Sequence, residues 1–227
     1  MPVGTHGAGA PVAAAWTFAV RGDLPVSPND SQATYASTPG AVCSSTAFAK
    51  DESVGQDVAS GFSLAGYPVA ASLLAHFLGG QGTEVDYKAG SSISKQAAAS
   101  SAFRAVDKTV QAQILAQLQA GTTRVQLAAA QLTTVAFEST GSDLYWGFRG
   151  TQGLTVSGGG TRQGGRYVGA LTYVIRDSYG FPAADTLDGF GPPMRYLQTV
   201  CGAPQHARGA HWFPDTITVT VPFDQPA

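Results

Sequence analysis

The residues best suited to proton transfer lie in the C-terminal quarter of the chain. Asp177 and Tyr179 stand two positions apart at the end of an apolar stretch, and His206 and His211 share a polar loop further on. A carboxylate close to an imidazole can titrate near neutral pH and move protons. We therefore expect these four residues to supply a catalytic group. Asp177 would lie at a solvent-accessible cleft with Tyr179 and at least one of His206 and His211, and a histidine would be the general acid. The alternative is that Asp177 caps a turn and Tyr179 closes the core.

A second set of side chains could hold a substrate. Arg195 and Arg208 carry planar guanidinium groups, which bind carboxylate or phosphate through paired hydrogen bonds. The aromatic side chains of Trp212 and Tyr145 could line a groove. Asp185 could add a second carboxylate, either as a base or as a metal ligand. The sequence assigns no metal-binding set and does not identify a cofactor.

Alternating apolar residues define the strands that would carry these groups. From Gly165 to Phe181 the alternation predicts a long central strand, with the candidate aspartate and tyrosine on its core face. Threonines alternate with apolar residues from Thr216 to Phe223, which predicts a closing strand. The segment Asp143–Arg149 also alternates and predicts a half-buried strand. Leu154–Ser157 predicts another, followed by the glycines of a hairpin.

Helical spacing of apolar residues predicts three helices, near residues 68–78, 95–120 and 193–201. The fold class is then α+β, with about three helices packed against one antiparallel, strongly bent sheet or partial β-barrel. Residues 61–227 would form this globular domain. Residues 1–60 would form a partly irregular N-terminal arm, with one plausible strand from Ala14 to Val20 and prolines that interrupt longer elements.

The composition argues against several classes of protein, namely those that bind nucleic acid or anionic lipid and those that span a membrane. Charged residues make up 12% of the chain, against about 25% in an average protein. The formal net charge of −2 leaves no basic patch for nucleic acid or anionic lipid. No apolar run approaches the roughly 20 residues that a membrane-spanning helix needs. A surface covered by Ser, Thr, Gln, Gly and Ala is commoner in exported proteins, so we expect a secreted or exported protein without a membrane span.

The two cysteines, Cys43 and Cys201, have neither metal-ligand nor redox spacing. We predict that they are bonded to each other, as suits an exported chain; the alternative is two unrelated buried thiols. The N-terminus lacks the basic and apolar regions of an intact secretory signal. Either the chain is mature, or it is exported by a route that reads no such signal.

Four short segments resemble a known family. They are H-F-L-G-G-Q-G-T-E-V-D-Y (76–87), D-L-Y-W-G-F (143–148), R-D-S-Y-G-F (176–181) and M-R-Y-L-Q-T-V-C-G (194–202). Their order is similar to that in a C-terminal domain of bacterial polymorphic toxins. That family shows a helix ending H-F-L before G-x-G, a D-W-Y-type strand, a D-x-Y-x-W/F strand exit and a helix with L-x-x-x-G. The resemblance covers about Tyr67 to Phe223.

A more distant likeness is to bacteriocins of the colicin M type. These cleave the lipid-linked peptidoglycan precursor with a D-x-Y-D strand followed by a His-Arg pair. Asp177 and Tyr179 match the first and third positions of that strand, and Gly180 replaces the second aspartate. No adjacent His-Arg pair follows. The resemblance implies that His206 with Arg208, or His211, would take its place.

Two functions follow from the residues and the resemblance together. The first is an exported antibacterial effector or bacteriocin-like toxin domain that acts on a cell-envelope substrate, with an immunity protein as a possible partner. The second is a non-catalytic β-rich binding or assembly module, in which the aromatic residues line a ligand groove or fill the core. The sequence leaves open whether the protein is an enzyme.

Overall fold

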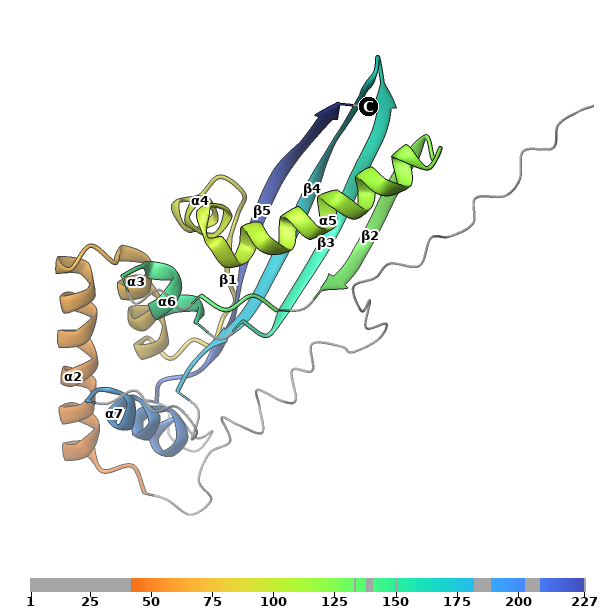
Figure 1. Ribbon diagram of the computed structural model, residues 1–227. Coiled ribbons are helices and arrows are strands. Elements are labelled where there is room, and N and C mark those ends of the chain that lie inside the picture. Colours follow the sequence, from red (N-terminus) through yellow and green to blue (C-terminus); the bar gives the residue numbers. More distant parts are fainter. Residues whose placement is uncertain are drawn as a thin grey trace, which may run out of the picture.

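The computed structural model describes residues 42–132, 134–137, 141–149, 151–181, 189–202 and 209–226. The fold is α+β, in agreement with the sequence. A long sheet has one helix lying along it, and a group of helices gathers at one end of the sheet (Figure 1). The possible strand Ala14–Val20 lies outside the described residues.

Five strands form one mixed sheet in the order β1-β5-β4-β3-β2. Their bounds are Val85–Tyr87 (β1), Arg124–Leu132 (β2), Gly153–Gln163 (β3), Arg166–Tyr179 (β4) and Phe213–Pro226 (β5). The strands from β2 to β5 pair antiparallel, in agreement with the antiparallel sheet expected from the sequence, whereas β1 pairs parallel with β5. Neither β1 nor β2 is among the strands predicted from the sequence. The two edges, β1 and β2, do not meet, so the sheet is not closed into a barrel.

The predicted central strand is β4, which pairs with β3 and β5 along its length. Its alternate residues are buried as the period-two pattern requires: Tyr167, Leu171, Tyr173, Ile175, Asp177 and Tyr179. The turn from β3 uses Gly164 and Gly165 at positive φ angles of 54° and 78°, a conformation that most other residues avoid. The predicted closing strand is β5, where Ile217, Val219 and Phe223 are buried.

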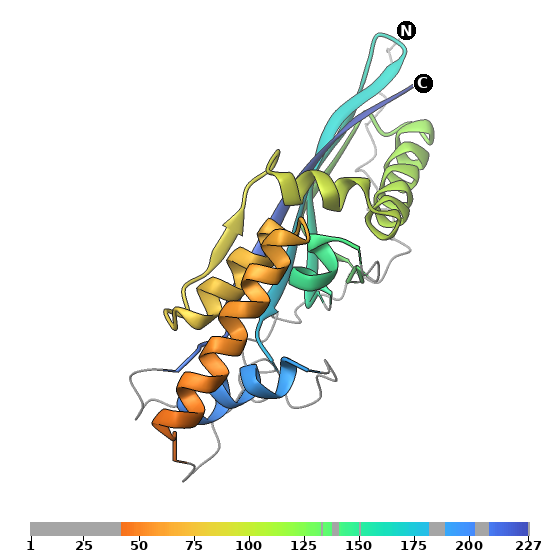
Figure 2. The same cartoon turned by 90° about the vertical axis from the view of Figure 1, so that its left-hand side faces the viewer.

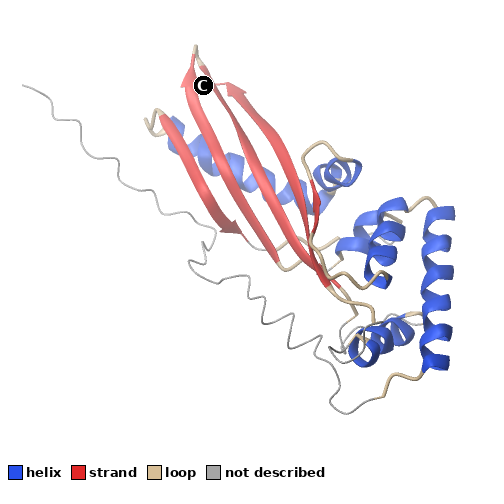
Figure 3. Ribbon diagram, turned by 180° about the vertical axis from the view of Figure 1, so that it is seen from behind, coloured by secondary structure: helices blue, strands red, loops and turns tan. Residues whose placement is uncertain are grey.

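Helix α5 (Ser101–Gln119) lies along the core face of the long strands. Its Phe103 packs edge-to-face on Tyr173 with the ring centroids 4.9 Å apart. The Tyr173 hydroxyl donates a hydrogen bond of 2.8 Å to Asp107 of the helix. Seen from behind, the opposite face of the sheet carries no described helix (Figure 3). The described helices therefore cover one side of the long strands.

Most of the other helices gather at the end of the sheet where β4 finishes and β5 begins. Helix α2 (Ser45–Leu64) packs on α3 (Pro68–Leu78), and both lie near α7 (Gly191–Tyr196) with its π-helical continuation η1 (Leu197–Cys201) (Figure 2). Edge-to-face aromatic contacts join these elements, with Phe181 in contact with Phe77 and Phe190. None of the described helices is long and apolar enough to span a membrane.

Cys43 and Cys201 form a disulfide bond with an S–S distance of 2.09 Å, which confirms the predicted pairing. The bond ties the residue before the cap of α2 to the last residue of η1. Cys201 is completely buried. A disulfide of this kind is consistent with an extracellular protein.

The prediction of a strand over Asp143–Arg149 is wrong: residues Asp143–Phe148 form helix α6. The Ser142 hydroxyl caps this helix by accepting from the amide of Tyr145, at 3.3 Å. The buried residues are Asp143, Leu144, Gly147 and Phe148, which is helical spacing and not alternation. Capping and burial on one helical face thus override the period-two pattern.

The helices are also more numerous than expected. The described chain holds six α-helices where the sequence predicts about three. The helix predicted over 95–120 is divided into α4 (Ser92–Ala99) and α5, because Ser100 adopts an extended conformation and caps α5. Helix α2 falls largely within the segment expected to be an arm. Its weak apolar pattern explains the omission, since only Gly55 and Phe62 are buried.

Candidate functional site: two opposed aspartates

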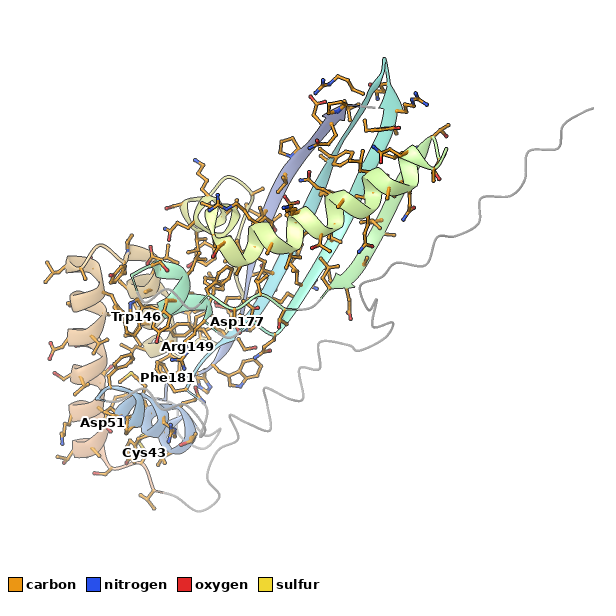
Figure 4. The ribbon with its side chains drawn as sticks, viewed as in Figure 1. Cys43, Asp51, Trp146, Arg149, Asp177 and Phe181 are labelled. Atoms are coloured by element: carbon orange, nitrogen blue, oxygen red, sulfur yellow. A yellow bond between two sulfur atoms is a disulfide. The ribbon has the colours of Figure 1, made fainter. Side chains whose placement is uncertain are left out.

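The register of β4 and β5 places Asp177 directly opposite Asp215. Both side chains lie on the core face, since each stands two residues from a buried isoleucine of its own strand, Ile175 or Ile217. Directly opposed residues of an antiparallel pair have Cβ atoms roughly 5 Å apart. Asp177 is 9% exposed and Asp215 is 0% exposed. Figure 4 shows Asp177 at the end of the sheet nearest the helices.

The two carboxyl groups have few partners. One oxygen of Asp177 accepts a hydrogen bond of 2.9 Å from the backbone amide of Ser178. Neither side-chain oxygen of Asp215 has a hydrogen-bond partner among the described residues. No salt bridge within the described part of the chain reaches either aspartate. Two buried carboxylates without a counter-ion would repel each other strongly, so the pair must hold at least one proton.

The electrostatics agree with this expectation. Burial raises the pKa of Asp177 to about 8, although the hydrogen bond from Ser178 lowers it somewhat. Burial also raises the pKa of Asp215 well above the usual range for a carboxyl, and the neighbouring Asp177 raises it further. The two carboxyls titrate as a coupled pair. Near neutral pH Asp177 can therefore give up or take a proton, which an ordinary aspartate cannot do.

A partly buried tyrosine, Tyr87, lies near Asp215 and near a further buried aspartate, Asp143. Burial raises the pKa of Tyr87 to about 12, with smaller contributions from the charges of Asp215 and Asp143. Asp143 itself accepts hydrogen bonds from the amides of Val69 and Ala70, at 3.0 and 2.9 Å. It thereby satisfies the first turn of α3, and its 3% exposure makes it structural in this position. Within the described residues, no group of three or more His, Cys, Asp or Glu side chains could hold a metal ion.

The predicted catalytic residues are not all placed together. Tyr179 is 7% exposed and stacks on Phe213 with the ring centroids 5.4 Å apart, as expected of a residue that closes the core. His211 is half-buried and lies against the turn formed by Gly80 and Gly82. No hydrogen bond among the described residues joins His211 to Asp177. The aspartate itself is buried, in contrast to the solvent-accessible cleft expected from the sequence.

Three of the named side chains, His206, Arg208 and Asp185, lie outside the described residues. The other predicted binding residues are distributed over the helical end. Tyr145 accepts a hydrogen bond of 3.4 Å from Arg149, whose guanidinium also lies 5.7 Å from the centroid of the tyrosine ring. Arg195 and Trp212 are half-buried, on α7 and just before β5.

Sequence reasoning missed Asp215, although the signal was present. The alternation that predicts the closing strand extends two residues back from Ile217 and places Asp215 on the buried face. It also missed Gln198, which is 4% exposed and whose side-chain carbonyl accepts a hydrogen bond of 3.0 Å from the amide of Phe181. A glutamine on a short apolar helix carries no signal of such a contact.

The site brings together segments that are distant in the sequence. Phe77 of α3 contacts Phe181 at 5.1 Å between ring centroids, and Tyr87 of β1 contacts Phe148 of α6 at 5.9 Å. Gln198 of η1 bonds the chain just after β4. Comparisons with protein-family models, with curated proteins and with solved structures give no match. The function must therefore be argued from the site itself.

Proposed function

We propose that this chain is an exported antibacterial effector or bacteriocin-like toxin domain that acts on a cell-envelope substrate, with Asp177 and Asp215 as its acid–base pair. The observation that carries the proposal is the opposition of two buried carboxyls, one of which has no hydrogen-bond partner among the described residues. Keeping a protonated carboxyl beside an ionised one is costly for stability, and sites of this kind serve proton transfer.

Two further observations support an exported effector. The disulfide between Cys43 and Cys201 suits an oxidising compartment. The four segments that resemble a polymorphic toxin domain are linked by two aromatic contacts and one hydrogen bond. These contacts lie at the end of the sheet that also carries the aspartate pair. Short motifs that are remote in sequence but adjacent in space are what a shared site would require.

The proposed chemistry is hydrolysis or group transfer with a shared proton. The ionised carboxyl takes a proton from water or a substrate hydroxyl as that oxygen attacks. The protonated carboxyl gives its proton to the leaving group, whose bond to the substrate breaks. Each turnover then exchanges the roles of the two carboxyls and returns the pair to one proton. This cycle requires both aspartates and no other titrating side chain.

A growth assay tests the proposal. The chain is expressed with a periplasmic signal in a sensitive bacterium, beside Asp177→Asn, Asp215→Asn and the control Asp224→Asn. Asp224 lies on the same strand as Asp215, but its side chain is 56% exposed and pairs with Arg166. We expect the wild type and the control to stop growth, and the two variants of the pair to permit it. Equal growth inhibition by all four proteins at equal expression would refute an acid–base role.

A second candidate is a non-catalytic binding or assembly module. The face of the sheet without a described helix favours it, since Thr172 on β4 lies between Ser157 on β3 and Thr220 on β5 there. Such a polar face could bind a partner without chemistry. If this candidate is right, the double variant Asp177→Asn/Asp215→Asn keeps the full biological effect.

A further inference from the structure

We propose that the π-helical turn η1 positions the two aspartates, with Gln198 as the positioning residue. This inference rests on the pair being the functional centre, and it extends that proposal to a residue that does not touch the carboxyls. The turn makes a specific contact with the chain beside each of the two strands that carry an aspartate. The relative placement of Asp177 and Asp215 depends on these two contacts.

The first contact holds the end of β4. The ladder between β4 and β5 finishes at Tyr179, which pairs with Phe213. Two residues later the backbone amide of Phe181 is buried and donates to the side-chain carbonyl of Gln198 at 3.0 Å. The glutamine therefore supplies the acceptor that a neighbouring strand no longer provides. It fixes the path of the chain four residues beyond Asp177.

The second contact holds the chain that leads into β5. Gly202, directly after η1, packs against Gly209 so closely that a Cβ atom on Gly209 would lie 1.9 Å from the Cα of Gly202. Only glycine permits this approach of two backbones. Gly209 stands six residues before Asp215. The backbone carbon of Cys201, the last residue of η1, would also lie 2.1 Å from that Cβ atom. The chains beside both strands are thus in contact with η1 and the glycine that follows it.

The turn is itself anchored. The last residue of the turn, Cys201, is bonded to Cys43. Tyr196 immediately precedes the turn, and its hydroxyl accepts a hydrogen bond of 3.1 Å from the amide of Ser44. A π-helical turn is a rare element that frequently occurs at functional sites. An anchored turn that contacts the chain beside both strands keeps the two carboxyls opposed and buried.

The test is a pH titration of the side-chain carboxyl carbons by NMR on the full chain with its disulfide intact. Gln198→Met keeps the shape of the side chain and removes the acceptor. The control is Thr199→Val in the same turn, which removes a hydrogen bond of 2.8 Å to the carbonyl of Arg195 and touches neither strand contact. Asparagine variants of Asp177 and Asp215 assign the two signals.

We expect Gln198→Met to lower the midpoint of the aspartate pair by at least about one pH unit, a tenfold rise in acid dissociation, because water reaches the loosened pair. Thr199→Val should leave the midpoint unchanged. If Gln198→Met does not fold, Gln198→Asn withdraws the amide by one methylene and is expected to shift the midpoint in the same direction.

An unchanged midpoint in a folded Gln198 variant would overturn the inference, as would an equal shift in Thr199→Val. Wild-type carboxyls that titrate in the ordinary acidic range would overturn it as well. The titration does not depend on activity. A shifted midpoint in a protein that never inhibits growth would therefore keep the positioning role of Gln198 and reject only the proposed function.

Discussion

The buried aspartate pair should make the protein less stable as the pH rises toward neutrality. In the unfolded chain an aspartate loses its proton near pH 4, whereas burial holds the pKa of Asp177 at about 8 and raises that of Asp215. Between these values the folded state binds more protons than the unfolded state. The free energy of unfolding then falls with increasing pH, and the stability contributed by the retained proton is complete below about pH 4.

The magnitude follows from proton linkage. Each proton kept by the folded state and lost by the unfolded state lowers the free energy of unfolding by about 1.4 kcal/mol per pH unit. From pH 5 to pH 7 the free energy of unfolding of the wild type should therefore fall by about 3 kcal/mol if the folded pair retains one proton, and by about twice that if it retains two. For a protein of this size, about 3 kcal/mol corresponds to a shift of about 6 to 12 °C in the thermal midpoint.

The comparison that isolates this effect is the wild type against Asp177→Asn/Asp215→Asn, because asparagine has no proton to lose. Both proteins are unfolded in urea at pH 5, 6 and 7 with the disulfide intact. From pH 5 to pH 7 the free energy of unfolding of the variant should rise, relative to that of the wild type, by at least about 3 kcal/mol. Asp224→Asn should keep the wild-type pH dependence. The reasoning would be refuted if the free energies of unfolding of the wild type and the double variant changed equally with pH. It would also be refuted if that of the wild type rose relative to that of the variant as the pH increased.

Two further changes test the framework that holds the pair. Replacing both Cys43 and Cys201 by serine opens a loop with a sequence separation of 158 residues. The free energy of unfolding, measured in urea, should fall by about 5 kcal/mol because the unfolded chain is no longer cross-linked. A loss below about 1 kcal/mol would contradict this loop-entropy argument. Asp143→Ala leaves the amides of Val69 and Ala70 without their acceptor and should lower the free energy of unfolding by about 1–3 kcal/mol. The exposed Asp224→Ala should lower it by less than about 1 kcal/mol. Equal losses in the two variants would show that the buried acceptor does not contribute to stability.

The parts of the fold that the sequence predicts well are those in which burial is one-sided and local. From Leu171 to Tyr179 the burial of strand β4 alternates from residue to residue, so Asp177 and Tyr179 could be assigned to the core face. Helix α3 begins with Pro68 and ends before two glycines, which are strong local signals. The disulfide could be predicted because the chain has only two cysteines and a composition that is commoner in exported proteins.

The remaining features depend on contacts between distant residues. Asp143–Phe148 alternates like a strand, but the helix forms because Ser142 caps it and Asp143 satisfies the first turn of α3. The partner of Asp177 is 38 residues further along the chain, and only the strand register brings the two together. Period-two alternation assigns a face to each residue but does not specify which residues of two strands are opposed.

The most direct test of the proposed function is turnover of an envelope substrate by purified, oxidised protein. Peptidoglycan and lipid-linked precursor are incubated with the wild type, Asp177→Asn, Asp215→Asn and Asp224→Asn, and the released products are quantified. We predict release by the wild type and by Asp224→Asn, with a loss of about a hundredfold or more in either variant of the buried pair. Release at the wild-type rate by both variants of the pair, or no release by the wild type from either substrate, would contradict the proposal.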